Sequence, residues 1–364
     1  MGACLMLSGA ACTEYNYNYS LVEDGEPRAQ PPASGTIDGG DSTDSPSTLP
    51  VLDGNYVTEF DLSTNLVYAG ANETLVVGTS AESPSLPDSV VFLEPATGRV
   101  LQSIALERGA ASRLALSGDG TTLWAVSTIS GDLVSVDLTS DALTPTVVGE
   151  SLFPTIEDAP VEVTGLEAVT GRSDAVIVST TAGGRFFGAT LYVSGEAQPL
   201  ALAGSAGPSQ LVSVGSAEWL YGAGAGTFYA LPILEGGLAA NPYPELIPDG
   251  SVAPSLFFGA ERVYSSDGSI IDVSVPGSPV GLSALPAASD VLLPLDGRLV
   301  TATGLDGSDQ LQSYDATTLE PIAGYTIAVD VTRFTDVVAT TPGYFAVGAQ
   351  DATGHRLHLF ANPF

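Results

Sequence analysis

Ser117-Gly-Asp-Gly-Thr-Thr-Leu-Trp-Ala-Val126, followed by Gly131-Asp-Leu-Val-Ser-Val-Asp137-Leu-Thr139, carries the pattern that decides the fold. A Gly/Asp-rich turn leads into an apolar run, a second turn follows, and the next run ends in an acidic residue. Short runs rich in Val, Leu, Thr and Trp, bounded by Gly-Asp pairs, are typical of antiparallel β-strands joined by tight turns. The stretch therefore predicts a turn, a strand, a loop, a strand and an acidic tight turn.

The same pattern recurs along residues 56–364 with a period near 44 residues. Glu94 lies 43 residues before Asp137, and Asp315 lies 178 residues after it, close to four repeats of about 44. Weaker copies fill the interval at residues 189–194, 226–231 and 268–274. A further 44 residues after Asp315 reach Leu359 in the last predicted strand, 358–361, which brings the count to seven units. Four short strands in roughly 40–50 residues are the signature of a propeller blade. We therefore expect an all-β fold, a seven-bladed β-propeller over residues 55–364.

The two ends of this region complement each other. The last unit supplies three strands, and residues 56–62 form a spare alternating strand ahead of the first full unit. Adding the spare strand to the last blade closes the ring and leaves no open edge between the first and last blades. We expect the propeller to be closed by this N-terminal strand.

The repeat at residues 117–138 resembles the YVTN-type repeat of bacterial and archaeal surface propellers, and it is similar to lactonase-like seven-bladed propellers. The motif is clear in about three of the seven units. Leu123-Trp-Ala-Val126 stands where that repeat has Tyr-Val-Thr-Asn. The resemblance implies a propeller fold and says far less about function.

The excess of acidic residues limits the kinds of molecule that the protein can bind. The chain has 42 acidic residues against 10 basic ones, all of them Arg, and a net charge of −32. A duplex or an anionic bilayer surface would repel such a chain, which excludes nucleic acid as a partner. The acidic surface is typical of a soluble protein outside the cytoplasm. The other interpretation is that some carboxylates bind Ca²⁺, which prefers oxygen ligands. Because the chain contains no D-x-[DN]-x-[DN]-G loop, we expect no metal and no other cofactor.

Residues 1–12 resemble the end of a bacterial lipoprotein signal peptide. They are uncharged and apolar, with small residues before Cys12. Gly9 occupies the place where a lipobox has Leu, Leu7 lies two residues further back, and a basic segment is missing. The resemblance implies lipidation at Cys12 and export to the cell envelope, as an outer-membrane, periplasmic or cell-surface protein; a disordered apolar N-terminus is the alternative. The segment is too short to span a bilayer, which needs about 20 apolar residues. Residues 13–54, which are acidic and rich in Pro, Gly and Ser, predict a flexible tether.

The sequence shows little catalytic chemistry. Its two histidines, His355 and His358, lie three apart on a predicted strand, so they face opposite sides and cannot share a metal. No Gly-x-Ser-x-Gly elbow, P-loop or dinucleotide fingerprint occurs. We assign no catalytic residue and no metal ligand.

Propellers bind ligands at the central channel and on the loops of one face. The candidate channel residues near the predicted innermost strands are Glu167, Arg113, Arg333, Asp336 and Asp290. Glu167 has a second interpretation, a carboxylate hydrogen-bonded at the edge of a blade. The segments 185–187 (Arg-Phe-Phe) and 241–244 (Asn-Pro-Tyr-Pro) are candidates for an aromatic patch that meets a partner, or for packing within the blades.

We expect a non-catalytic binding or scaffolding module. It would act as a monomer that takes a protein or a small ligand on one propeller face and touches the membrane through its lipid anchor alone. The tether and the scarcity of His and Cys in the body favour this hypothesis. The alternative is a lactonase- or phosphoesterase-like hydrolase assisted by Ca²⁺, which needs carboxylates that converge at the channel mouth. A structural role in a surface layer or matrix is the third possibility.

Overall fold

The structure is a computed structural model that describes most of the predicted propeller. The described residues are 51–52, 55–57, 60–106, 109–140, 142–149, 161–204, 207–247, 255–285, 288–295, 297–304, 310–327, 331–340, 343–352 and 354–363. Cys12, and the signal-like segment and tether up to residue 50, lie outside them. Among the described residues, no helix is long and apolar enough to cross a membrane.

Seven small sheets form the molecule, and each is one blade of a β-propeller. Blade 1 contains β3 (Val67–Ala69), β4 (Thr74–Gly78), β5 (Ser89–Leu93) and β6 (Val100–Ala105), with the 3₁₀ turn η1 (Gly70–Asn72) between the first two. Blade 2 contains β7 (Ala111–Leu116), β8 (Thr122–Ser127), β9 (Leu133–Asp137) and β10 (Pro145–Gly149). Blade 3 contains β11 (Val161–Ala168), β12 (Ala175–Ala182), β13 (Arg185–Val193), β14 (Glu196–Ala197) and β15 (Leu202–Ala203).

The remaining four blades follow in chain order. Blade 4 contains β16 (Gln210–Ser213), β17 (Trp219–Gly224), β18 (Thr227–Leu234), β19 (Gly237–Leu238) and β20 (Asn241–Tyr243), followed by the 3₁₀ turn η2 (Pro244–Leu246). Blade 5 contains β21 (Leu256–Gly259), β22 (Arg262–Ser265), β23 (Ile270–Asp272) and β24 (Val280–Gly281). Blade 6 contains β25 (Val291–Leu295), β26 (Arg298–Thr303), β27 (Gln310–Asp315), β28 (Pro321–Ile327) and β1 (Val51–Leu52). Blade 7 contains β29 (Arg333–Thr340), β30 (Tyr344–Asp351), β31 (Gly354–Ala361) and β2 (Asn55–Val57). The predicted seven-bladed all-β propeller is confirmed.

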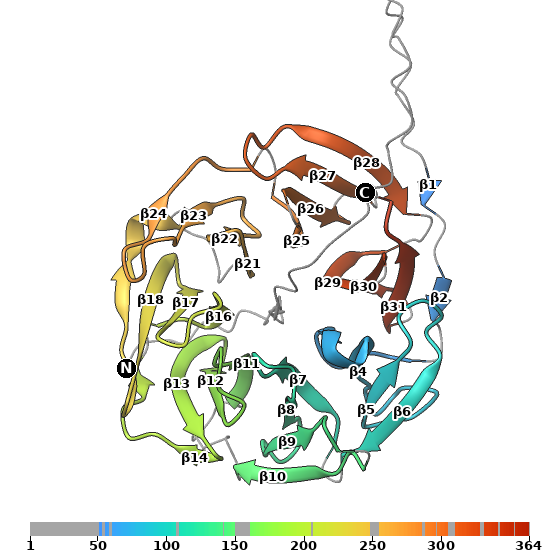
Figure 1. The fold of residues 1–364 in the computed structure, drawn as a ribbon, viewed down its shortest axis with the longest axis horizontal. Coiled ribbons are helices and arrows are strands. Elements are labelled where there is room, and N and C mark those ends of the chain that lie inside the picture. The colour runs from blue at the N-terminus through green and yellow to red at the C-terminus, as the bar shows by residue number, and fades with distance from the viewer. Residues whose placement is uncertain are drawn as a thin grey trace, which may run out of the picture.

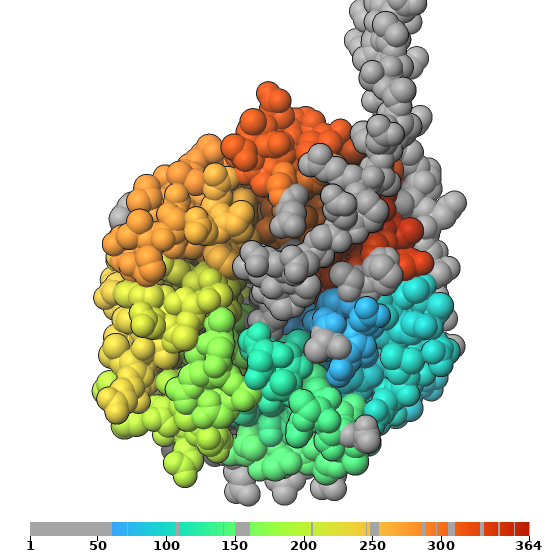
Figure 2. Space-filling model, viewed as in Figure 1, coloured from blue at the N-terminus to red at the C-terminus, as the bar shows by residue number. Residues whose placement is uncertain are grey.

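The first strand of each blade lies nearest the axis of the ring (Figure 1). The innermost strands β3, β7, β11, β16, β21, β25 and β29 contact one another in sequence around the ring, and β29 contacts β3. In the space-filling view the blades follow one another in chain order, and the last blade lies against the first (Figure 2). The ring is therefore closed by contact between blades 7 and 1.

The apolar core lies between the blades. One cluster joins blade 1 to blade 2, another joins blade 2 to blade 3, and a third joins blade 4 to blade 5. Both faces of a middle strand are covered, so five of the six residues of β8 are buried, whereas the outer strand β10 has exposed and half-buried residues. This explains why the second strand of each repeat is an apolar run rather than a strict alternation.

The acidic residue that marks the repeat has a local structural role. Asp137, Asp272 and Asp315 each end the third strand of a blade. Their carboxylates accept the main-chain N–H two residues further on, at 2.8 Å in all three turns. Such a side chain replaces a missing main-chain partner and fixes the tight turn. Hydrogen bonds from the side chains of Thr139 and Ser274 and from the Thr318 N–H are the main reason that the pKa values of Asp137, Asp272 and Asp315 lie below the ordinary range, and the three turn N–H groups lower them further.

The N-terminal strand closes the ring, as predicted, but it covers Asn55–Val57 rather than residues 56–62, because residues 60–62 already cross towards blade 1. β2 adds to the outer edge of blade 7 by antiparallel pairing with β31, with Tyr56 opposite His358. β1, which comes from the end of the predicted tether, pairs in parallel with β28 on the outer edge of blade 6. The N-terminal segment therefore covers the outer edges of two successive blades.

The chain that runs from β2 into blade 1 is held to blade 7 by main-chain hydrogen bonds. The Leu62 N–H donates to the His355 carbonyl at 2.8 Å, and the His355 N–H donates to the Asp61 carboxylate at 2.8 Å. The Arg356 guanidinium donates to the Phe60 carbonyl at 3.0 Å. The Arg356 side chain of blade 7 thus provides a partner for a carbonyl of the crossing chain, and the Asp61 side chain of the crossing provides one for an N–H of blade 7.

The same segment continues to blade 2. The Ser63 hydroxyl donates to the Ala111 carbonyl at 2.8 Å. The Asn65 amide makes two hydrogen bonds with the main chain of Leu114, each of 2.9 Å, one as donor and one as acceptor. Residues 60–66, which we call the closing segment, thus join blades 7, 1 and 2.

We predict that deletion of residues 55–62 unfolds the domain, because it removes β2 and the first half of the closing segment. Deletion of residues 13–49 leaves β1 and β2 in place, so its melting temperature should match that of the full chain. Thermal unfolding followed by circular dichroism distinguishes the two deletions. Equal melting temperatures for both would show that ring closure does not need this strand.

Candidate functional site

Glu167 lies on β11, the innermost strand of blade 3, and is fully buried. Its Oε2 atom accepts the N–H of Ser213 on β16 at 3.2 Å. The carboxylate therefore links blade 3 to the innermost strand of blade 4. This hydrogen bond agrees with the second interpretation of Glu167, a carboxylate that is hydrogen-bonded at the edge of a blade.

Asp336 lies on β29 and is also fully buried. The pairing of β29 with β30 shifts register between Phe334 and Asp336, which marks a bulge. Oδ2 of Asp336 accepts the N–H of Leu66 in the closing segment. This carboxylate crosses the seam between the last and first blades, so it strengthens the ring at the place where the chain closes.

Asp290 precedes β25 and joins blade 6 to blade 7. Its Oδ2 atom accepts the Gly304 N–H at 2.9 Å within its own blade and the Phe334 N–H at 3.2 Å in the next one. Together with Asn65, the three predicted carboxylates bridge four blade boundaries. All four side chains accept main-chain N–H groups, which are costly to bury without a partner.

The two predicted arginines lie on innermost strands. Arg113 is on β7 and is half-buried, and its Nη1 atom donates to the Ser112 carbonyl at 3.1 Å. Arg333 begins β29 and is half-buried. A Cβ atom placed on Gly304 would lie 3.4 Å from the Asp290 Oδ2 atom and 3.4 Å from the Arg333 Cα atom. The structure thus brings Asp290, Arg333 and Asp336 to the boundaries around blade 7, and it places Arg113 and Glu167 on the neighbouring strands β7 and β11.

A metal centre is not assembled from these groups. In the part of the chain that the structure describes, no group of three or more His, Cys, Asp or Glu side chains is arranged to hold a metal ion. Glu167, Asp290 and Asp336 each accept a main-chain N–H from a neighbouring blade, and Asp290 also accepts one from its own blade.

His355 makes a contact that the sequence did not reveal. Its Nε2 atom hydrogen-bonds the Thr335 hydroxyl, and its Nδ1 atom lies 3.2 Å from the Leu62 carbonyl oxygen. A carbonyl can only accept, so Nδ1 carries the proton and Nε2 accepts from the hydroxyl. Gly348 makes room for the pair, because a Cβ there would lie 2.9 Å from Thr335 Oγ1 and 3.2 Å from His355 Nε2.

A hydroxyl that donates to an imidazole is the contact of a nucleophile with its base. Here the imidazole also binds the closing segment, and burial lowers the pKa of His355. Thr335 and His355 are 20 residues apart, and the contact depends on the bulge in β29. No sequence motif records such a pair.

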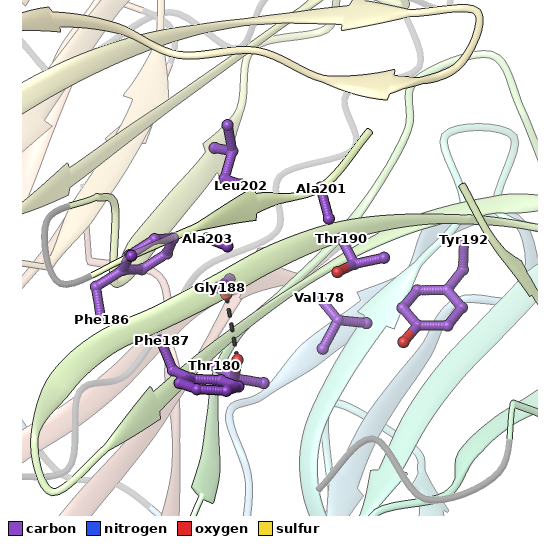
Figure 3. A pocket seen from close by; sticks show the side chains of 11 residues that line it. Val178, Thr180, Phe186, Phe187, Gly188, Thr190, Tyr192, Ala201, Leu202 and Ala203 are labelled. Carbon is purple, nitrogen blue, oxygen red and sulfur yellow. Dashed lines mark hydrogen bonds between the residues drawn. The ribbon is translucent and has the colours of Figure 1, made fainter. Parts of the chain in front are cut away.

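A cavity of about 500 Å³ lies on blade 3 (Figure 3). It is lined by residues of β12, β13 and the β15 region: Val178, Thr180, Phe186, Phe187, Gly188, Thr190, Tyr192, Ala201, Leu202, Ala203 and Gly204. Val178 also belongs to the core cluster between blades 2 and 3, and Tyr192 packs against that cluster. We call this cavity the blade-3 pocket.

The pocket lies where the outer strand of blade 3 is divided. β14 pairs with Tyr192 and Val193, and β15 pairs with Gly188 and Ala189 on the same neighbour, β13. Between them, Leu200 leaves blade 3 and hydrogen-bonds Gly236 and Leu238 of blade 4, at 2.8 and 2.9 Å. The fourth strand is therefore interrupted, and the segment that follows the interruption forms one wall of the pocket.

The predicted Arg-Phe-Phe segment contributes to the pocket. The register of β12 and β13 shifts beside Phe187, which is 37% exposed, whereas Phe186 is 7% exposed and packs in the core between blades 3 and 4. Tyr243 is half-buried and donates its hydroxyl hydrogen to the Gly277 carbonyl on blade 5 at 2.7 Å. No residue of 241–244 lines the pocket.

The chain matches no protein-family model, and no curated protein matches it significantly.

We predict that His358 makes stability fall in acid. Burial lowers the pKa of His358 from 6.5 to about 4, while the charge of Asp351 opposes this shift. The unfolded chain takes up a proton near pH 6.5, whereas the folded protein does so near pH 4. Stability is therefore complete above pH 6.5 and declines as the pH falls towards 4, by up to about 3 kcal/mol.

Urea unfolding of the wild type and of His358→Gln at several pH values between 7 and 4.5 measures this effect. The variant should lose less stability than the wild type across that range. A constant difference between the two proteins at every pH would show that His358 does not bind a proton on unfolding.

Proposed function

We propose that this chain is an exported, non-catalytic propeller that acts as a binding or scaffolding module. The observation that supports this proposal is that the carboxylates on or beside the innermost strands form hydrogen bonds between blades. Glu167, Asp290 and Asp336 each accept a main-chain N–H from a neighbouring blade. A metal-assisted hydrolase needs such carboxylates to converge on a substrate or a cation.

The blade-3 pocket supports a binding role. Its volume of about 500 Å³ falls in the range of small-molecule sites, and every residue that lines it is uncharged. It is open to solvent at Phe187 and at the exposed residues 203–204. A ligand or an apolar side chain of a partner protein can enter without a change in the propeller.

The alternative is a hydrolase that resembles the lactonase-like propellers. The Thr335–His355 pair is the observation that favours it, because it supplies a hydroxyl and a base in contact. Against it, the imidazole is also bound to the Leu62 carbonyl and so helps to hold the closing segment. We therefore propose that Thr335 and His355 help to close the ring and do not act in catalysis.

Location and anchoring complete the proposal. We propose that Cys12 is lipidated and that the acidic segment of residues 13–50 separates the propeller from the membrane, at the cell envelope. The net charge of −32 supports this arrangement, because an anionic bilayer surface repels the propeller. The YVTN-type resemblance of residues 117–138 agrees with a surface propeller. We propose a monomer.

We predict that neither Ca²⁺ nor EDTA shifts the melting temperature of the purified protein, and that it hydrolyses neither lactones nor phosphoesters. Differential scanning fluorimetry and chromogenic ester assays measure the two properties. A Ca²⁺-dependent rise in melting temperature, or turnover that Thr335→Val abolishes, would establish the hydrolase alternative.

We predict that Cys12→Ser moves the protein from the membrane fraction to the soluble fraction of an expressing bacterium. The physical reason is the loss of the buried acyl chains, which contribute about 0.8 kcal/mol per buried CH₂ group. Fractionation with labelled palmitate measures both lipid and location. Cys4→Ser is the matched control and should stay at the membrane; a soluble wild type without label would contradict the anchor.

A further inference from the structure

The blade-3 pocket has a polar end, and the inference that follows rests on the binding role proposed above. Thr190 and Tyr192 are two residues apart on β13, so their side chains lie on the same face of the sheet. Within the described residues neither hydroxyl makes a hydrogen bond, whereas the neighbouring Thr180 hydroxyl donates to the Gly188 carbonyl at 3.2 Å. Figure 3 shows Thr190 and Tyr192 on the same side of the pocket.

Apart from Thr180, whose hydroxyl is used within blade 3, the rest of the pocket is apolar. Val178, Leu202 and the two phenylalanines Phe186 and Phe187 provide aliphatic and aromatic surface around the hydroxyls. Phe187 is 37% exposed and sits at the pocket, and burial raises the pKa of Tyr192, which agrees with its low-dielectric surroundings. A ligand with an alkyl or aromatic body gains most by covering this surface.

Charge restricts the ligand further. No residue that lines the pocket is charged, so an ionic ligand would lose hydration without gaining an ion pair. The net charge of −32 adds a long-range repulsion of anions. A neutral ligand avoids both penalties.

We propose that the blade-3 pocket binds a neutral, mainly apolar small molecule whose one polar oxygen accepts hydrogen bonds from Thr190 and Tyr192. The volume of about 500 Å³ suits a ligand of roughly two fused rings with short substituents. The hydroxyls orient the oxygen, and Phe187 covers the exposed side of the ligand.

The neutral naphthyl ketone prodan is a suitable probe, since its fluorescence shifts to the blue in apolar surroundings and its carbonyl oxygen accepts hydrogen bonds. Titration of the full chain should give saturable binding of one molecule per chain with a blue shift. Thr190→Val and Tyr192→Phe each remove a hydroxyl with little change of shape and should weaken binding roughly 3- to 10-fold. Phe187→Ala should weaken it by about tenfold or more.

Leu101→Ala is the matched control, because Leu101 is an apolar side chain on the outer strand of blade 1 with 48% exposure and no contact with the pocket. Its affinity for prodan should equal that of the wild type. The anion naphthalene sulfonate, of similar ring size, should not bind measurably. Circular dichroism and melting temperature verify that each variant is folded.

Several outcomes would overturn this inference. They are the absence of saturable binding by the folded wild type, binding of several molecules per chain, equal affinity in the pocket variants, and naphthalene sulfonate binding as tight as that of prodan. These outcomes leave the binding role itself intact, because another face can serve a partner. Hydrolysis of lactones or phosphoesters would instead overturn the proposed non-catalytic function. The prodan titration would still decide separately whether the pocket binds a neutral apolar ligand.

Discussion

The closing contact between blades 7 and 1 is the constraint on which the propeller depends. Each blade has two apolar faces and can bury them only against a neighbour on either side, so a ring with one open seam would expose two faces. The closing segment covers this seam by joining β31 on one side to β7 on the other. Its main-chain groups bond the His355 carbonyl, the Arg356 guanidinium and the Asp336 carboxylate of blade 7. Its Asp61 and Asn65 side chains in turn accept main-chain N–H groups of β31 and β7.

The same requirement for partners explains the acids at the centre of the ring. Where innermost strands of successive blades meet, a carboxylate or amide from one blade accepts a main-chain N–H of the next. Glu167, Asp290 and Asp336 do so at three boundaries and Asn65 at a fourth. Acids near a channel resemble catalytic groups in a sequence, yet here their hydrogen bonds are between blades. This is why we favour binding over catalysis.

The pocket arises where a blade divides its outer strand, as blades 3 and 4 both do. In blade 3 the outer strand is divided into β14 and β15, and Leu200 between them bonds to blade 4. Blade 2 instead has a single fourth strand, β10, along β9, and blade 4 divides its outer strand into β19 and β20. Sites of function are expected where local structure departs from the rule that the rest of the fold obeys. Thr190 and Tyr192, whose hydroxyls make no hydrogen bond to another described residue, give the blade-3 pocket a specific chemistry.

The number of blades, the all-β class and the closing strand can be predicted from the sequence alone. Acidic turns near residues 94, 137 and 315 mark a local pattern of hydrogen bonds, so their spacing can be read without coordinates. The sequence also predicts that Glu167 and Asp336 lie on innermost strands, but it does not predict which groups they bind. Only the tertiary structure decided the parallel pairing of β1 with β28, the Thr335–His355 contact and the blade-3 pocket. Asp336 and Leu66 are 270 residues apart in the chain. Their hydrogen bond forms beside a bulge in β29, which the sequence pattern does not predict. The reason is physical: local turns follow from neighbouring residues, whereas contacts across a seam exist only after the ring has closed.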